Sequence, residues 1–274
     1  IDPTPGPAEV AAELAAAAEA VYADTIVLLD VGGDVLAHGT EAGLASPLAD
    51  AVLLAAAPRL AGHHGLRVLG AVFGAGCDGE LTAAEVSSRL AEVAAAGGDL
   101  GQIPLDTAAL TLLERACAVV PTEASAMALR CAKGHIGRVP IRGGRRTVEL
   151  TQAGGIVACF DPDAALRSSA RLAQLVRNAP DMEAANALLT AHGIATELRY
   201  ERAAAAEHQR FEEEQRRLAA TQVTATEPIA PTLLAHLPGQ TGVSEEAMKH
   251  LFTHFTEREQ KEHISRQEQQ RTTA

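Results

Sequence analysis

Two short stretches of the chain combine carboxylates with glycines, a pattern typical of sites that bind a cation or a phosphorylated compound. In the first, LLDVGGD, an apolar run ends at Asp30, and two glycines and Asp34 follow at once. Carboxylate oxygens are preferred ligands of Mg²⁺ and Mn²⁺. We therefore expect Asp30 and Asp34 to hold one of these cations. The backbone of Gly32 and Gly33 would then contact the substrate. The alternative is a tight turn in which Asp30 is a cap and Asp34 is solvated.

The second stretch, GAGCDGE, follows another apolar run and carries Asp78 and Glu80. Ligand sites of open α/β sheets lie at the carboxyl ends of the strands, so neighbouring strands would bring both stretches together. We predict that Asp78 or Glu80 is the catalytic base for a water molecule. Gly76 is assigned to substrate binding. Cys77 is a poor candidate nucleophile, because the neighbouring acids disfavour its thiolate.

The glycines of this second stretch also have the spacing GxGxxG, which is typical of dinucleotide binding. However, Asp78 would repel a pyrophosphate, and the sequence offers no acidic residue after a third strand to hold a ribose. A redox or hydride-transfer enzyme is therefore disfavoured, and we expect no flavin.

Three other segments could hold the substrate. The segment SPLAD predicts a helix that begins after Ser46 with Asp50 in its first turn, where a phosphate could bind or where Ser46 is a simple cap. Glu123 and Ser125 open another helix. Arg142 lies in RGGRR, which could bind a phosphate or carboxylate or form a solvated hairpin tip. We assign all five residues to substrate binding.

Zinc and haem are not expected. The four cysteines are far apart and form no CxxC, which favours reduced thiols over a disulfide framework or a thiolate zinc site. His250 and His254 have the spacing of a zinc pair, but no general-base Glu follows the first histidine, so a solvated or partner-facing pair is favoured.

The composition excludes several classes of protein. A net charge of −12, from 35 acidic and 23 basic residues, argues against nucleic acid or an acidic membrane as partner. No apolar run is long enough to span a bilayer, and the alanine-rich opening lacks the features of a signal peptide. We expect a cytoplasmic protein, and the many alanines and arginines indicate a bacterial genome rich in G and C.

The elements that must position these residues alternate between helix and strand. We predict helices over residues 7–22, 48–61, 82–98, 107–120, 122–133, 161–179 and 181–193, strands over 24–30, 66–74 and 155–161, and a hairpin over 139–150. Short loops between such elements indicate an α/β fold. We expect a three-layer, Rossmann-like, mainly parallel sheet with helices on both faces and a helical C-terminal extension.

The amino-acid composition of the sequence changes after residue 200. Residues 1–200 have the pattern of an α/β domain, whereas residues 201–274 form a charged helical tail interrupted by a Pro/Thr-rich linker. Such helices could recruit a partner or join two copies of the chain into a homo-oligomer.

The motifs taken together resemble a known family. The segments DPTPGP, LLDVGGDVLAHGTEAGLASPLADA, GAGCDGELTAAEV, PTEASA, RRTVEL and FDPDAALRSSARLAQLV are similar, in this order, to the bacterial and archaeal family catalogued as domain of unknown function 1152. The resemblance covers about residues 2–200. It singles out Glu41 besides the residues above, and it implies an α/β fold but no established reaction. It also implies a further strand and glycine-rich, Asp-containing loop upstream of DPTPGP, so this chain is expected to lack one βα unit of the sheet.

Two functions fit these observations. The first is a metal-dependent hydrolase of small-molecule metabolism that acts on a phosphorylated or hydroxyl-rich compound. The second is a non-catalytic nucleotide- or metabolite-binding protein whose C-terminal helices bind a partner or form a dimer.

Overall fold

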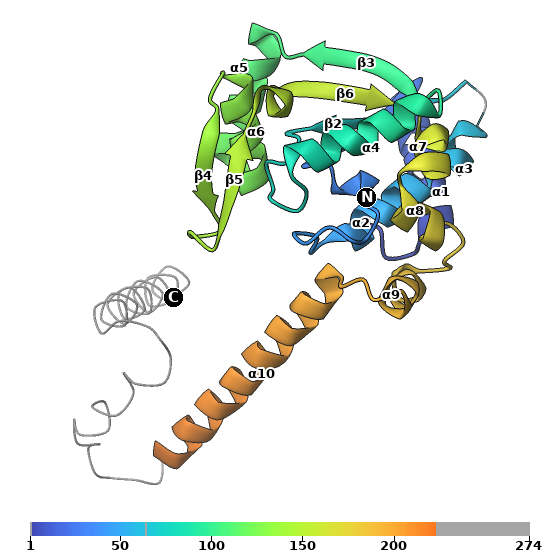
Figure 1. Cartoon of the computed structure of the whole chain (residues 1–274). Helices are drawn as coiled ribbons and strands as arrows, with labels where there is room; N and C mark the ends of the chain where they lie inside the picture. The colour runs from blue at the N-terminus through green and yellow to red at the C-terminus, as the bar shows by residue number, and fades with distance from the viewer. Residues whose placement is uncertain (1, 64, 223–274) are drawn as a thin grey trace, which may run out of the picture. The chain divides into compact units, whose positions relative to one another are not determined.

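The computed structural model describes residues 2–63 and 65–222 (Figure 1). The chain divides into two compact units, residues 1–207 and residues 208–274. The described part of the second unit is helical. The Pro/Thr-rich linker, the second tail helix and the pair His250 and His254 lie outside the described residues.

The elements follow one another with short loops, as the sequence predicts for an α/β fold. In chain order they are α1 (Pro7–Ala20), β1 (Thr25–Val31), η1 (Asp34–Leu36), α2 (Pro47–Ala55), α3 (Ala57–Ala61), β2 (Arg67–Phe73), α4 (Ala83–Ala95), β3 (Asp99–Pro104), α5 (Thr107–Val119), α6 (Glu123–Ala132), β4 (Gly137–Ile141), β5 (Arg146–Leu150), η2 (Gln152–Gly155), β6 (Ile156–Phe160), α7 (Pro162–Ser168), α8 (Arg171–Val176), α9 (Met182–Ala191) and α10 (Glu197–Gln222).

The main sheet is mixed rather than mainly parallel. Its strand order within the described residues is β1-β2-β6-β3. Strands β1 and β2 pair in parallel, whereas β6 pairs antiparallel with both β2 and β3. The chain leaves β3 at the end of the sheet where α5, α6 and the β4–β5 hairpin lie, and it enters β6 from that same end (Figure 1). A helical crossover back to the opposite end, which parallel pairing requires, is therefore missing before β6.

Strand β3 was not predicted. Its sequence, DLGQIP, contains residues that are rare in strands, and every residue of it is exposed. It is an edge strand held by its pairing with β6. Pairing with a neighbour, rather than local propensity, makes this segment a strand.

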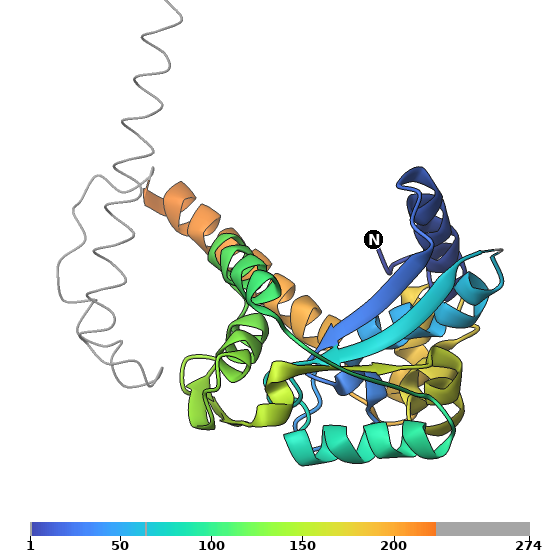
Figure 2. The same ribbon diagram turned by 90° about the horizontal axis from the view of Figure 1, so that it is seen from above.

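The two faces of the sheet are covered differently. Helices α1, α2, α3, α4, α7 and α8 form the main core with Val72 and Phe160 on one face. Figure 2 shows α2, α4, α7 and α8 gathered on one side of the strands. On the other face, α6 and the hairpin cover Phe73 at the carboxyl end, but Val27 and Leu29 remain 50% and 53% exposed. The prediction of helices on both faces therefore holds only at that end of the described sheet.

Local signals set several boundaries. The predicted capping box of α4 is present, because Thr82 and Glu85 hydrogen-bond each other's backbone N–H. The single helix predicted over 48–61 is divided into α2 and α3, and Pro58 lies in the first turn of α3, where its missing N–H does no harm. No helix in the described residues is long and apolar enough to cross a membrane.

Candidate functional site

The loops after β1 and β2 lie side by side at the carboxyl ends of these two strands. The N–H of Gly32 donates to the carbonyl of Phe73 at 3.0 Å, and the N–H of Gly76 donates to the carbonyl of Gly32 at 2.8 Å. Gly32 has φ +142°, and a Cβ atom there would lie 2.5 Å from Cγ of Asp78. Only glycine allows the first loop to approach the second this closely.

Three aspartates from three neighbouring elements meet beside these loops. Asp30 is the last residue but one of β1, Asp34 begins η1, and Asp50 lies in the first turn of α2. One carboxylate oxygen from each lies within 4.8 Å of the others. The structure thus brings together the two predicted metal ligands and adds Asp50, which the sequence assigned to the substrate.

These aspartates differ in how they are bonded. The carboxylate of Asp30 accepts hydrogen bonds from the N–H groups of Gly33 at 2.8 Å and Val35 at 3.3 Å. Asp34 is only 5% exposed, and its carboxylate has no hydrogen bond or ion pair with any other described residue, although its oxygens keep some contact with solvent. A carboxylate with so little solvent and no donor is costly unless it is protonated or binds a cation.

Burial and mutual repulsion raise the pKa values of the cluster. Burial, followed by the charges of Asp30 and Asp50, raises the pKa of Asp34 to about 10. Burial also raises the pKa of Asp30 to about 8 and that of Asp50 to about 7, with neighbouring carboxylates adding to both shifts. At neutral pH the cation-free cluster therefore retains protons that a cation would have to displace.

The two predicted catalytic acids have different environments. Asp78 is partly buried, accepts the N–H of Glu80 at 3.2 Å, and has its pKa raised to about 6, chiefly by burial. Glu80 is buried and accepts hydrogen bonds from the N–H groups of Ala45 at 2.7 Å and Ser46 at 2.8 Å, and from the hydroxyl of Ser46 at 2.5 Å. The carboxylate of Glu80 is therefore used to hold its own loop against the segment that precedes α2. The carboxylate of Asp78 can still accept further hydrogen bonds.

The start of α2 is capped from an unexpected part of the chain. Ser46 occupies the N-cap position, but its side chain makes no capping hydrogen bond because its hydroxyl donates to Glu80. Glu197, the first residue of α10, instead accepts the N–H groups of Leu48 at 3.0 Å and Ala49 at 2.7 Å. The alternative in which Ser46 is a simple cap is therefore wrong. No local signal in the sequence could reveal a capping residue that lies about 150 residues away.

The β4–β5 hairpin, predicted around Gly143 and Gly144, packs on the second loop. Arg142 contacts Glu80 at 3.2 Å, and its N–H donates to Glu123 at 2.7 Å. Arg146 donates to the carbonyls of Gly43 and Gly79. Arg142 and Glu123 are thus connected to the acidic loops through Glu80.

Ser125 makes no hydrogen bond, within the described residues, with the other residues that were predicted to bind the substrate. It takes part in the opening of α6, where its N–H donates to the hydroxyl of Thr122 at 3.3 Å. None of its hydrogen bonds within the described residues reaches the aspartates, so its contact in the structure is that of a helix start.

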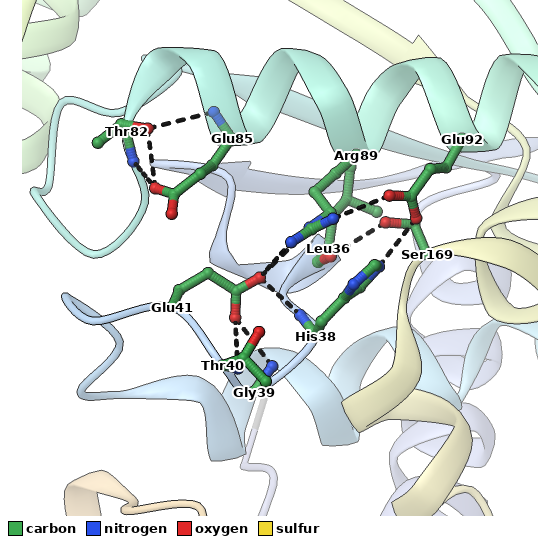
Figure 3. Close-up of polar contacts among 10 residues, drawn as sticks. All are labelled: Leu36, His38, Gly39, Thr40, Glu41, Thr82, Glu85, Arg89, Glu92 and Ser169. Atoms are coloured by element: carbon green, nitrogen blue, oxygen red, sulfur yellow. Dashed lines mark hydrogen bonds and ion pairs between the residues drawn. The ribbon is translucent and has the colours of Figure 1, made fainter.

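A second polar network fixes the chain that leads from η1 to α2 (Figure 3). The buried carboxylate of Glu41 accepts the N–H groups of His38, Gly39 and Thr40 and pairs with Arg89 of α4 at 2.9 Å. Although burial raises the pKa of Glu41, these hydrogen bonds outweigh it and lower the pKa below its usual value.

Two more contacts extend this network along α4. Arg89 also pairs with Glu92 at 2.8 Å, and Glu92 contacts the His38 ring at 2.8 Å. This network was not predicted from the sequence, although the spacing of Arg89 and Glu92 is that of a helical ion pair. This network anchors to α4 the segment that lies between Asp34 and Asp50.

The chain matches one known family of proteins. The family described as "Protein of unknown function (DUF1152)" matches residues 1–205. Neither the curated proteins nor the solved structures gave a match.

Proposed function

The chain belongs to the family described as protein of unknown function DUF1152, and from the geometry of its acidic loops we propose that it is a hydrolase that uses Mg²⁺ or Mn²⁺. Its substrate would be a small phosphorylated or hydroxyl-rich compound. The observation that carries the proposal is the convergence of Asp30, Asp34 and Asp50, with Asp34 buried and without a donor.

The composition of the cluster supports a hard divalent cation. All three side chains offer oxygen, which suits Mg²⁺ and Mn²⁺ better than softer metals. The guanidinium of Arg142 pairs with Glu80 rather than with the aspartates. A cation would therefore supply the positive charge that the described side chains do not, and would act as a Lewis acid when bound.

Asp78 is the residue that we propose as the base. Its pKa of about 6 leaves it ionised at pH 7 to 8, so it can accept a proton from an attacking water. Glu80 would be a positioning residue, because three hydrogen bonds from Ala45 and Ser46 occupy it. Arg142 would orient the substrate.

Titration calorimetry with MnCl₂ and MgCl₂ tests the cation site. We expect wild-type protein to bind, and Asp34→Asn and Asp50→Asn to weaken binding by more than about tenfold. Asp163→Asn, which removes an exposed carboxylate from α7, is the matched control and should bind as wild type does. Absence of binding by wild-type protein would overturn the proposal.

Release of inorganic phosphate from a panel of sugar phosphates and nucleotides, with Mn²⁺ present, tests the reaction. Asp78→Asn should retain Mn²⁺ binding and lose turnover, because it removes the proposed base but none of the three ligands. Binding of both cation and phosphorylated compound without turnover would favour the non-catalytic binding protein instead.

A further inference from the structure

Two of the four cysteines lie against each other outside the aspartate cluster. Cys77 belongs to the loop between β2 and α4, and Cys131 belongs to the last turn of α6. Their Sγ atoms are 3.6 Å apart, and the residues are 1% and 4% exposed. Within the described residues no such thiol contact involves Cys117 or Cys159, which serve as internal references.

The packing holds this pair of thiols in place. A Cβ atom on Gly154 of η2 would lie 2.8 Å from Sγ of Cys131 and 3.1 Å from Sγ of Cys77. The other neighbours are apolar and include Phe73, Ala128 and Leu150. Neither sulfur can therefore move far from the other without disturbing this second core.

A cavity of about 450 Å³ reaches the neighbourhood of the thiols. It is lined by Gly76, which precedes Cys77, and by Thr151, which precedes η2, whose Gly154 packs against both sulfurs. The hydroxyl of Thr151 is itself buried and has no hydrogen-bond partner. A small polar oxidant that enters this cavity would reach Gly76, the residue next to Cys77.

We propose that Cys77 and Cys131 are a site of reversible oxidation, at which a peroxide converts the two thiols into an intramolecular disulfide. One sulfur attacks a peroxide oxygen, breaks the O–O bond and becomes a sulfenic acid, with release of water. The second sulfur then attacks the first, forms the S–S bond and expels a second water. The sum is two thiols and one hydrogen peroxide giving one disulfide and two waters, with both electrons passing from sulfur to peroxide.

The two thiols affect each other's acidity. The contact between them lowers the pKa of Cys131, whereas the same contact, together with burial, raises the pKa of Cys77. Either sulfur can be the donor of this contact, so either can make the first attack. Bond formation then requires the Sγ atoms to approach from 3.6 Å to about 2.0 Å.

Peptide mapping of the full chain tests this proposal, because trypsin places each cysteine in its own peptide. Cys77 falls in residues 68–89, Cys117 in 116–130, Cys131 in 131–133 and Cys159 in 147–167. The folded protein is treated with one equivalent of hydrogen peroxide, free thiols are alkylated, and the digest is analysed without reduction. We expect peptide 68–89 linked to peptide 131–133, lighter by two hydrogens than their sum and separated by phosphine reduction.

Two variants complete the test. Cys117→Ser should keep the linked peptide, and Cys131→Ser should lose it. A disulfide that involves Cys117 or Cys159, a bond between two chains, a sulfinic acid as the end product at Cys131, or four thiols that remain reduced would each overturn the proposal. The oxidised chain should also melt at a higher temperature than the reduced chain, because the bond closes a loop between residues 54 positions apart.

Discussion

Asp34 couples the acidity of the solution to the stability of the fold. Its pKa is about 10 in the folded protein, whereas an aspartate in an unfolded chain has a pKa of about 3.9. The folded state therefore binds more protons than the unfolded state over the range between these values. The contribution of this retained proton to the free energy of unfolding is fully present below pH 4 and is lost as the pH rises towards 10.

We predict that the cation-free protein is less stable at pH 9 than at pH 6. Each proton retained by the folded state alone contributes up to about 1.4 kcal/mol per pH unit to this trend. Asp34→Asn should flatten the trend, because its amide does not titrate. Urea denaturation in EDTA at several pH values measures it, and equal slopes for wild type and Asp34→Asn would contradict the prediction. Mg²⁺ should stabilise the wild type more at pH 9 than at pH 6, because it replaces the lost protons.

The residues of the site could be predicted only in part. Asp30 and Asp34 could be selected as candidates because a strand followed by glycines and acids has a recognisable pattern. The grouping of Asp50 with them depends on how α2 packs on η1, which no local pattern encodes. For the same reason the occupation of Glu80 by Ser46, 34 residues away, could not be foreseen.

At the scale of the elements, β1 has one buried and one open face. Leu28 packs against the main core, whereas its neighbours Val27 and Leu29 are half-exposed. Successive side chains of a strand point to opposite faces, so this alternation fixes the register of β1 beside β2. The sequence of the strand, TIVLLDV, is continuously apolar from Ile26 to Leu29, and this run predicted burial on both faces.

We predict that Leu28→Thr and Leu29→Thr have unequal effects. The first removes apolar contacts in the core and should lower the free energy of unfolding by about 1 to 3 kcal/mol. The second alters a half-exposed position and should change it by less than about 0.5 kcal/mol. Both variants introduce the same side chain into the same strand, so each is the control for the other in urea denaturation. Equal losses would show that both faces are packed.

Element type was easier to predict than strand direction. Helical patterns and the hairpin around Gly143 and Gly144 are local signals, and each has its counterpart in the fold. The reversed direction of β6 depends instead on where α5, α6 and the hairpin gather, which is a property of tertiary packing. Likewise, the polar segment of β3 becomes a strand because it pairs with β6, which is also a tertiary contact.

At the scale of the whole molecule, the first compact unit extends into α10. It ends at Glu207, close to the end of the family match at residue 205. It therefore includes Glu197, which caps α2, but excludes most of the charged tail.

We predict that residues 1–207 fold and retain the melting temperature of the full chain. In this shortened chain, Glu197→Ala should reduce the free energy of unfolding by about 1 kcal/mol, because α2 loses its cap. Glu201→Ala removes an exposed carboxylate from the same helix and should have little effect. Thermal and urea unfolding of the three proteins measure these differences. Equal losses in the two variants would mean that the cap does not stabilise α2.

The cap on α2 also has a consequence for biosynthesis. Ribosomes release α2 early, but Glu197 follows it by about 150 residues. A nascent chain that has emerged only as far as α9 holds all three site aspartates without the carboxylate that completes α2. The scaffold of the aspartate cluster is consequently completed only at the end of translation of the domain, so a truncated product of interrupted synthesis would carry the aspartates on an incomplete scaffold.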